Sequence, residues 1–371
     1  MGLGEGTMED LVNPMAGPWR GRSVLVTGHT GFKGGWLALW LARLGARVHG
    51  FALDPPTAPS FFDTARVADV LASDTRADLA DLDALRSVLA RAQPVAIFHL
   101  AAQSLVRESY RDPLATFATN VMGTAHVLEA ARAIPATRAL VVVTTDKVYE
   151  NRESMHAYEE HDPLGGHDPY SASKAASEIV AASYRSSFFT GNDAEAPRIA
   201  TARAGNVFGG GDWAKDRLVP DALRCFAAGE PLRLRFPAAV RPWQHVLEPV
   251  AGYLALAEAL LGGGGVQCAQ AWNFGPTEQD MASVGDVAAA IARLWGEGAR
   301  VEASTDMHPH EAGLLMLDSR RARDTLGWRP RWSLEHALAR TLAWQRSWHA
   351  GADMQAITLA QIDDYIATGQ A

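Results

Sequence analysis

The chain's architecture is set by one short passage, Ser23-Val24-Leu25-Val26-Thr27-Gly28-His29-Thr30-Gly31-Phe32-Lys33-Gly34. Its first five residues are mostly apolar and β-branched, which indicates a buried strand, and the following Trp36–Leu41 is helical in character. Glycines between a strand and a helix let the backbone approach a pyrophosphate, and the helix N-terminus supplies N–H groups. The spacing is Gly-x-x-Gly-x-x-Gly rather than Gly-x-Gly-x-x-Gly. The passage predicts a dinucleotide-binding turn, with contacts from Gly28, Thr30, Gly31, Phe32, Lys33 and Gly34.

Length, charge and cysteine content bound the possible functions. The 371 residues suit one large α/β domain with a smaller lobe. A net charge of -8 argues against a broad nucleic-acid-binding surface. The two cysteines, Cys225 and Cys268, give no disulfide framework, so we expect a reducing compartment, the cytoplasm. The apolar runs are too short to span a bilayer, and residues 1–18 resemble a loose extension without a signal peptide.

A second strand, predicted over Arg47–Leu53, ends at Asp54. An acid there could bind an adenine-ribose hydroxyl and favour NAD, or it could be an ordinary loop residue. No arginine lies between Asp54 and Asp63 to hold a 2′-phosphate, which also favours NAD, whereas Lys33 weakly favours the phosphate. Further along, Asp78 and Leu79 could close over the adenine, or Asp78 could be a solvated acid.

The next strand, predicted within Val95–Gln103, ends in small residues that leave room for a cofactor. His99 lies inside the apolar run and is interpreted as a packed core residue rather than a ligand. Thr119–Thr124 is predicted to open a helix, in which Asn120 either holds backbone near the site or caps the helix. The predicted cofactor contacts from this part of the chain are Leu100, Ala101, Ala102 and Thr119.

Polar residues follow the predicted strand Ala139–Val143, in the run Thr144-Thr145-Asp146-Lys147-Val148-Tyr149. They form either a strand-end turn with a solvated Asp-Lys pair or a group aimed at one substrate. Tyr170 and Lys174 follow in Asp168-Pro169-Tyr170-Ser171-Ala172-Ser173-Lys174, four apart and therefore on one face of a helix. A lysine cation beside a phenol favours the phenolate, which can take a proton from a sugar hydroxyl. Together these motifs favour a site.

These motifs, with Leu100-Ala101-Ala102-Gln103-Ser104, resemble the extended short-chain dehydrogenase/reductase family over residues 20–350. Arg203–Asp212 and Arg241–Val246 are similar to the subgroup of that family that dehydrates CDP-glucose. The resemblance implies an α/β fold, with a Rossmann-type doubly wound parallel sheet and a smaller C-terminal substrate-binding lobe. We expect the NAD-binding domain over 19–200 and mainly the substrate lobe over 201–371, with some segments returning to the first domain.

The resemblance also implies an internal redox reaction. Tyr170 would deprotonate the 4′-hydroxyl while hydride passes to NAD, and Lys174 would lower the tyrosine pKa and hold the nicotinamide ribose. Thr145 would hydrogen-bond the 4′-oxygen, and Asp146 would protonate the departing 6′-hydroxyl. Lys147 stands where related dTDP-glucose enzymes carry glutamate as the C5′ base. Since a lysine is a base only when neutral, Lys147 could instead stabilise the enolate as a cation.

The second half of the chain is expected to bind the rest of a nucleotide-sugar substrate, CDP-glucose. Arg241 is the best candidate for a diphosphate clamp, because its guanidinium offers a charged fork, with a surface ion pair as the alternative. His308-Pro309-His310-Glu311 is too short to indicate a metal site. A homodimer or tetramer is expected, because family members pair through two long helices. The predicted substrate contacts are Gln103, Asn206, Val219 and Arg241.

Two other functions compete with dehydration. A sugar-nucleotide epimerase or reductase acting on a dTDP-, UDP- or GDP-hexose would share the fold, but epimerisation at C4′ needs no elimination acid such as Asp146. A catalytically silent NAD-sensing binder would not need Thr145, Tyr170 and Lys174 together. The sequence therefore favours the dehydratase.

Overall fold

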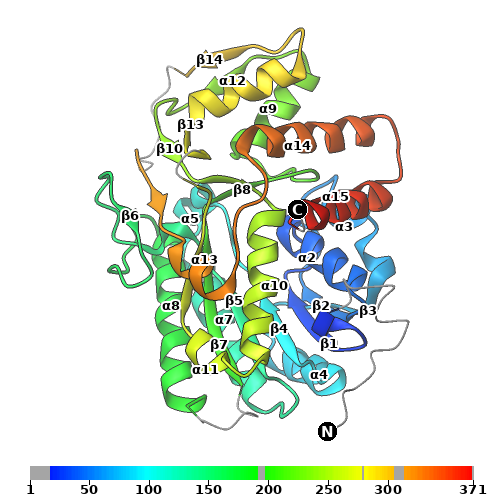
Figure 1. Ribbon diagram of the computed structural model, residues 1–371, viewed down its shortest axis with the longest axis vertical. Helices are drawn as coiled ribbons and strands as arrows, with labels where there is room; N and C mark the ends of the chain where they lie inside the picture. Colours follow the sequence, from blue (N-terminus) through cyan, green and yellow to red (C-terminus); the bar gives the residue numbers. More distant parts are fainter. Residues whose placement is uncertain (1–16, 191–196, 278–279, 305–312, 370–371) are drawn as a thin grey trace, which may run out of the picture.

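A computed structural model describes residues 17–190, 197–277, 280–304 and 313–369 (Figure 1). Residues 1–16 of the predicted extension and the sequence His308–Glu311 lie outside the described residues. The 3-10 turn η1 (Gly17–Trp19) precedes the first strand, and its Trp19 side chain is fully buried and donates to Glu258.

The centre of the molecule is a seven-stranded sheet in which every neighbouring pair is parallel. The strand order is β12-β7-β5-β4-β1-β2-β3. The chain adds β2 and β3 on one side of β1, and then adds β4, β5, β7 and β12 on the other side, as in a doubly wound fold. This confirms the predicted Rossmann-type sheet. The strands are β1 (Ser23–Thr27), β2 (Arg47–Ala52), β3 (Leu71–Arg76), β4 (Ala96–His99), β5 (Ala139–Val143), β7 (Arg198–Ala204) and β12 (Ala271–Phe274).

The inner strands are apolar because helices cover both faces of the sheet. All five residues of β5 are buried, whereas the edge strand β3 is mostly accessible. One core packs the sheet against α2 and α10, and a second packs it against α4, α7 and α8 (Figure 1). These helices are α2 (Phe32–Arg43), α4 (Leu82–Ala92), α7 (Gly123–Arg132), α8 (Pro169–Phe188) and α10 (Leu247–Leu261).

A smaller group of elements lies beyond one edge of the sheet, at the top of Figure 1. There α9 packs on α12, α12 packs on α14, and β9 pairs with β14. The last helix, α15, returns to pack on α2, and β12 joins the central sheet, so segments after residue 200 serve both parts. The elements are α9 (Leu218–Ala227), β9 (Leu232–Leu234), α12 (Val284–Trp295), β14 (Val301–Ala303), α14 (Leu334–His349) and α15 (Met354–Thr368).

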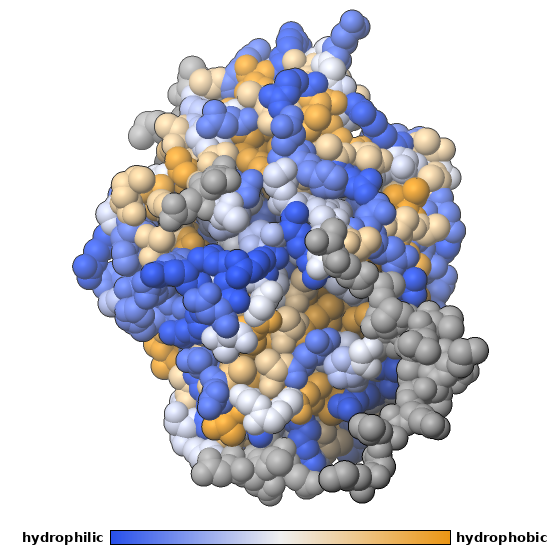
Figure 2. Space-filling view, viewed as in Figure 1, coloured by the Kyte–Doolittle hydropathy of each residue, from blue (hydrophilic) through white to orange (hydrophobic). Residues whose placement is uncertain are grey.

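Short elements complete the chain. On the face seen in Figure 2, hydrophilic residues gather around β6, where Arg320 pairs with Glu159 and Asp318. The short helices are α3 (Phe61–Thr64), η2 (Val67–Val70), α5 (Val106–Arg111), α6 (Pro113–Phe117), η3 (Ala118–Met122), η4 (Asp146–Val148), α11 (Gly265–Cys268) and α13 (Arg320–Leu326). The short strands are β6 (Ala157–Tyr158), β8 (Asn206–Phe208), β10 (Val240–Arg241), β11 (Trp243–His245), β13 (Ala282–Ser283) and β15 (Met316–Leu317).

One helix prediction is wrong in its start. The helix expected to open at Thr119 already begins at Pro113 in α6, and it continues into α7 through the single π-helical turn η3. Asp112 caps it by accepting from Ala115, a signal that the sequence interpretation overlooked. Asn120 therefore lies inside the helix and is not its cap.

Candidate active site

The candidate site lies at the carboxyl edge of the sheet, between the neighbouring strands β1 and β4. The strand order changes direction between these two strands, and open α/β sheets hold ligands at this point. Gly28 has a φ of +78°, and a Cβ on it would lie 2.6 Å from the backbone nitrogen of Ala101. Only glycine permits this approach, which brings the two strand-end loops into contact.

The predicted dinucleotide turn has the geometry that a pyrophosphate requires. Gly34 packs so closely on the carbonyl oxygen of Gly28 that a side chain would collide with it. The first turn of α2 has no side-chain cap, so its N–H groups and its positive dipole end are available to an anion. These features fit the pyrophosphate of a dinucleotide, because no side chain caps the first N–H groups of α2.

Beside Asp54 lies an arginine that the sequence interpretation missed. Asp54 follows β2 with 90% of its side chain exposed, and Arg76, at the end of β3, approaches it at 3.4 Å. A second carboxylate, Asp74, holds Arg76 at 2.8 Å. Arg76 lies outside the segment 54–63 in the sequence, but it comes close to Asp54 because β3 pairs with β2 in the sheet. With two acids beside it, Arg76 is largely neutralised.

The other predicted cofactor residues lie around this turn. Asp78 is exposed and accepts a hydrogen bond from the Ala80 backbone nitrogen at 2.8 Å. Leu79 is buried against Gly123. Thr119 and the strand-end residues Leu100, Ala101 and Ala102 are half-buried. Their contact with a cofactor stays a prediction.

Asn120 joins the loop after β4 to α8. Its side chain accepts from the Gln103 nitrogen at 2.8 Å and donates to the Gln103 oxygen at 3.0 Å and to Ser173 at 2.8 Å. The interpretation that Asn120 holds backbone near the site is thus confirmed. Gln103 in turn uses its amide on Leu105 and Thr116, so its predicted substrate contact stays a prediction. His99 is a packed core residue as expected, bonded to Thr27 and Thr124.

The predicted catalytic residues converge beyond the end of β5. Thr145 donates to Asp146 Oδ1 at 2.9 Å and lies close enough to the Tyr170 phenol to lower its pKa. Asp146 is 1% exposed, and its Oδ2 has no partner in the described part of the chain. Burial raises the pKa of Asp146, because a charged carboxylate is poorly solvated there. Burial therefore shifts Asp146 toward its neutral, proton-donating form, and one of its oxygens has no protein partner among the described residues.

Tyr170 and Lys174 both lie on α8, which Asp168 caps by accepting from Ser171 at 2.9 Å. Burial raises the pKa of Tyr170 to about 12, although Thr145 and the charge of Arg217 oppose the rise. Burial lowers the pKa of Lys174 to about 8, and its Nζ donates to the Val143 oxygen at 3.1 Å.

Further cations surround these groups. Lys33 donates to the Tyr253 hydroxyl at 3.3 Å, and burial, helped by the charges of Arg217 and Lys174, lowers the pKa of Lys33 to about 7. Arg217, another residue that the sequence interpretation missed, bridges Asp212 at 2.9 Å and Ser104 at 3.2 Å. Its signal was its position two residues before Val219, which is a predicted substrate contact.

Arg241 is buried in β10, donates to the Val240 oxygen, and acts on Asp146 through its charge. Basic side chains outnumber acids around the site, which favours an anionic ligand. The bases are Lys33, Lys147, Lys174, Arg217 and Arg241, and the acids are Asp146, Asp168, Asp212 and Glu178. The other two predicted substrate contacts are half-buried Asn206 in β8 and buried Val219 in α9.

Comparison with known proteins places this site in a family. The family model for GDP-mannose 4,6 dehydratase matches residues 25–341. The chain belongs to this dehydratase family. It is 46% identical over 350 residues to the CDP-glucose 4,6-dehydratase of Salmonella typhimurium, which covers 94% of this chain and 97% of that protein. It is 30% identical over 345 residues to the dTDP-glucose 4,6-dehydratase of Streptomyces antibioticus, covering 87% and 92%. The resemblance inferred from the motifs is confirmed.

Two solved structures share the fold of this chain. MoeE5 in complex with UDP-glucose and NAD superposes with a TM-score of 0.74 at 25% identity, covering 88% of this chain and 99% of that one. The dTDP-glucose 4,6-dehydratase of Bacillus anthracis, in complex with NAD, gives a TM-score of 0.73 at 22% identity, covering 88% and 97%.

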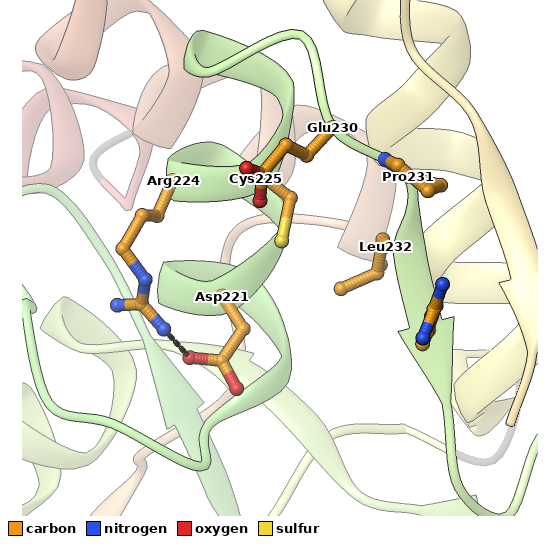
Figure 3. Close-up of a pocket in the computed structure, with 7 residues that line it drawn as sticks. Asp221, Arg224, Cys225, Glu230, Pro231 and Leu232 are labelled. Atoms are coloured by element: carbon orange, nitrogen blue, oxygen red, sulfur yellow. Dashed lines mark hydrogen bonds and ion pairs between the residues drawn. The ribbon is translucent and has the colours of Figure 1, made fainter.

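A separate pocket lies between α9 and β9 (Figure 3). Asp221 and Arg224 pair on its wall, with the Cys225 sulfur beside them (Figure 3). Burial raises the pKa of Cys225, so its thiol is a weak nucleophile. None of the predicted site residues lines this pocket, and the dehydratase-family motifs do not include it. In the described ranges no group of three or more His, Cys, Asp or Glu could hold a metal ion.

Proposed function

We propose that this protein is an NAD-dependent CDP-glucose 4,6-dehydratase, which converts CDP-glucose to CDP-4-keto-6-deoxyglucose. The observation that carries this proposal is Asp146: a buried carboxyl whose pKa is raised and whose Oδ2 has no partner among the described residues, one hydrogen bond from Thr145 and next to Tyr170. Such a group is suited to protonate a departing hydroxyl. The 46% identity to a CDP-glucose 4,6-dehydratase supports the choice of substrate.

The glycine turn supports NAD as the cofactor, because Gly28 and Gly34 leave the backbone close to the uncapped start of α2. We assign the pyrophosphate to Gly28–Gly34, the adenine to Asp78 and Leu79, and the nicotinamide ribose to Tyr170 and Lys174. When bound, NAD accepts hydride from C4′ and returns it to C6′.

The protein's own groups move the protons. Tyr170 takes the proton of the 4′-hydroxyl. Its pKa is about 12 in the free protein even with the charge of Arg217 acting on it, so it needs additional positive charge. We propose that Lys174, one helical turn further along α8, supplies that charge when the site is occupied. Thr145 holds the 4′-oxygen, and Asp146 donates a proton to the 6′-hydroxyl as it leaves.

The C5′ proton is the step with two candidate roles for Lys147. As a neutral amine it would be the base, and as an ammonium it would stabilise the enolate. The half-buried position of Lys147 beside Asp146 permits both roles. Arg241 and Arg217 are proposed to hold the substrate diphosphate, with Asn206, Val219 and Gln103 near the rest of the nucleotide sugar.

Incubation of the purified protein with CDP-glucose tests this proposal. We expect a product lighter by one water, with the alkali-induced absorbance of a 4-keto sugar. Turnover of dTDP- or UDP-glucose instead of CDP-glucose would overturn only the assignment of cytosine as the nucleobase of the substrate. Conversion of a UDP-hexose to its 4-epimer without loss of water would identify an epimerase. Binding of NAD with no turnover of any nucleotide sugar would identify a non-catalytic binder.

We also propose that the protein works as a homodimer or tetramer in a reducing compartment such as the cytoplasm. Exposed apolar side chains occur on adjoining helices, Leu114 and Phe117 on α6 and Ile179 on α8. Cys225 and Cys268 are both free thiols. Among the described helices, none is both long and apolar enough to cross a membrane. A monomeric mass in light scattering would contradict the oligomer.

A further inference from the structure

A buried ion pair lies directly beneath the candidate site. Glu178 follows Lys174 by four residues on α8, and therefore shares its helix face. Arg203 on β7 forms a bidentate pair with Glu178: Nε donates to Oε1 at 2.9 Å and Nη2 donates to Oε2 at 3.0 Å. The two side chains are only 4% and 3% exposed. Burying both charges costs several kcal/mol before their attraction is counted, so this pair is a weak explanation for stability alone.

The remaining hydrogen bonds of the pair reach two other segments, the turn 144–149 and Glu160, and Thr201 on β7 itself. Glu178 also accepts from Thr144 at 2.6 Å and from Thr201 at 2.5 Å. Arg203 also donates to the Tyr149 hydroxyl at 2.8 Å and to the Glu160 oxygen at 3.1 Å. Every side-chain nitrogen and oxygen of the pair therefore has at least one hydrogen-bond partner within the protein.

These partners flank the catalytic candidates in sequence. Thr144 directly precedes Thr145, and Tyr149 directly follows η4, which carries Asp146 and Lys147. Tyr149 is itself fixed by donating to Asn273 on β12 at 2.7 Å. The ion pair thus connects the helix bearing the proposed base with both ends of the turn bearing the proposed acid.

We propose that Glu178, held by Arg203, is a positioning residue for the reaction proposed above. It fixes the turn 144–149 against α8, and its negative charge keeps Lys174 in the ammonium form. The inference rests on the proposed function only for the identity of the reaction; the geometry and the charge coupling are properties of the free protein.

The electrostatics agree with this role. Burial alone would raise the pKa of Glu178, but Arg203 and its hydrogen bonds outweigh burial and lower it, so the carboxylate is charged at neutral pH. Glu178 in turn raises the pKa of Lys174 against the effect of burial. The other groups that act on or respond to Lys174 are Lys33 on α2 and His99 on β4, and neither brings a negative charge. Removing the Glu178 charge must therefore lower the pKa of Lys174 below about 8.

The chain offers an unusually clean measurement of that change. It contains four lysines, Lys33, Lys147, Lys174 and Lys215. Protein labelled with ¹³C at the lysine ε-carbon gives four signals, and Lys174→Arg identifies one of them. In Glu178→Gln we expect the Lys174 titration to move down on the order of one pH unit. The readout requires neither substrate nor turnover.

Activity provides the second arm. With CDP-glucose, we expect Glu178→Gln to lower kcat by about 100-fold, as a small misplacement of catalytic groups does, and to change KM less. The alkaline limb of kcat should move to lower pH with the Lys174 titration. Thr144→Val cuts the link to the turn but keeps the ion pair, so it should lower kcat without moving that limb.

Glu248→Gln is the matched control. Glu248 is also buried, at 1% exposure, and accepts from Tyr365 and from the Arg331 and Trp332 nitrogens on the other face of the sheet. It should lose stability but keep the Lys174 titration and the pH profile. Should Glu178→Gln fail to fold, the double variant Glu178→Gln/Arg203→Gln removes both charges and takes its place.

Two failures are distinguishable. An unchanged Lys174 titration, with kcat lowered only as far as in Glu248→Gln, would overturn the positioning role. Wild-type protein that does not turn over CDP-glucose would overturn the proposed function, while the titration would still decide the charge coupling.

Discussion

Asp146 and Glu178 are both buried carboxyl groups, yet they lie in two contrasting regions. Asp146 lies on the turn at the sheet edge, with one hydrogen bond to Oδ1 and none to Oδ2 within the described chain. Glu178 lies one layer deeper, with both oxygens bonded to Arg203 and each to a threonine. Burial dominates at the first, raising the pKa, whereas hydrogen bonds and an opposite charge dominate at the second, lowering it. The contrast separates a proton donor from a fixed charge.

The largest effect is expected at the edge. Tyr170→Phe removes the proposed base and should lower kcat by about 10⁴-fold, the upper range for a general base. NAD affinity should remain, because the glycine turn is untouched. Isothermal titration with NAD and a turnover assay check both parts. Loss of NAD binding in step with activity would show that the Tyr170 hydroxyl acts by holding the cofactor rather than by taking the proton.

Asp146→Asn tests the proton donor itself. The amide keeps the shape but cannot protonate a leaving hydroxyl, so we expect dehydration to fall by about 100-fold or more. Oxidation at C4′ should still occur, and rapid-quench mass spectrometry should detect a 4-keto sugar that retains its 6′-hydroxyl. Asp212→Asn, on a carboxylate that pairs with Arg217, is a comparison variant. Undiminished water loss in Asp146→Asn would transfer the acid role elsewhere.

The stability of the two regions should depend on pH in opposite senses. The pKa of Asp146 is raised on folding, so its contribution is present at low pH and is lost as pH rises through the folded value. The pKa of Glu178 is lowered, so its contribution is present above the ordinary carboxyl pKa and is lost as pH falls through the folded value. Urea unfolding across pH should therefore show Asp146→Asn gaining on wild type as pH rises, and Glu178→Gln falling behind. Parallel curves for the two variants would contradict the contrast.

The depth of burial should also set the cost of losing a carboxylate. Glu178→Gln leaves Arg203 buried without its charge partner, which costs about 3–5 kcal/mol of unfolding free energy. Asp221→Asn breaks a pair in which Arg224 is 53% exposed, and should cost less than about 1 kcal/mol. Chemical denaturation measures both at one pH. Similar losses would show that burial is not the controlling variable.

The smallest effect is expected at Lys33. Its pKa of about 7 predicts that the ammonium is present below that pH and lost above it. If Lys33 helps hold an anionic cofactor, NAD should bind more weakly as pH rises through about 7, by a few-fold. Lys33→Met should abolish this dependence while Lys215→Met, on an exposed lysine, should keep it. A pH-independent affinity in wild type would remove Lys33 from the cofactor site.

Local motifs predicted much of the site. The strands Ser23–Thr27 and Ala139–Val143 are found with the predicted bounds, since a short apolar run between turn residues carries its own boundary signal. Tyr170 and Lys174 share a helix as predicted, and this helix begins at Asp168-Pro169, a cap followed by a proline at the first helical position. The start of the helix at Pro113 was missed, although Asp112-Pro113 carries the same signal.

Contacts between distant segments were not predictable in this way. Arg76 reaches Asp54 only because β3 pairs with β2, and Arg217 reaches Ser104 only across the site. No periodicity in a sequence records such pairings. The same holds for the pair of Glu178 and Arg203. The sequence assigned no role to Glu178, and Arg203 was noted only as part of the motif Arg203–Asp212.

The sequence alone determined the parallel sheet, the glycine turn and the identity of the proposed acid and base, because each depends on neighbours within a few residues. The tertiary structure decided which of those groups are charged. Protonation depends on burial and on partners brought together from remote positions, as Arg203 is to Glu178 and as the partnerless oxygen of Asp146 shows within the described residues.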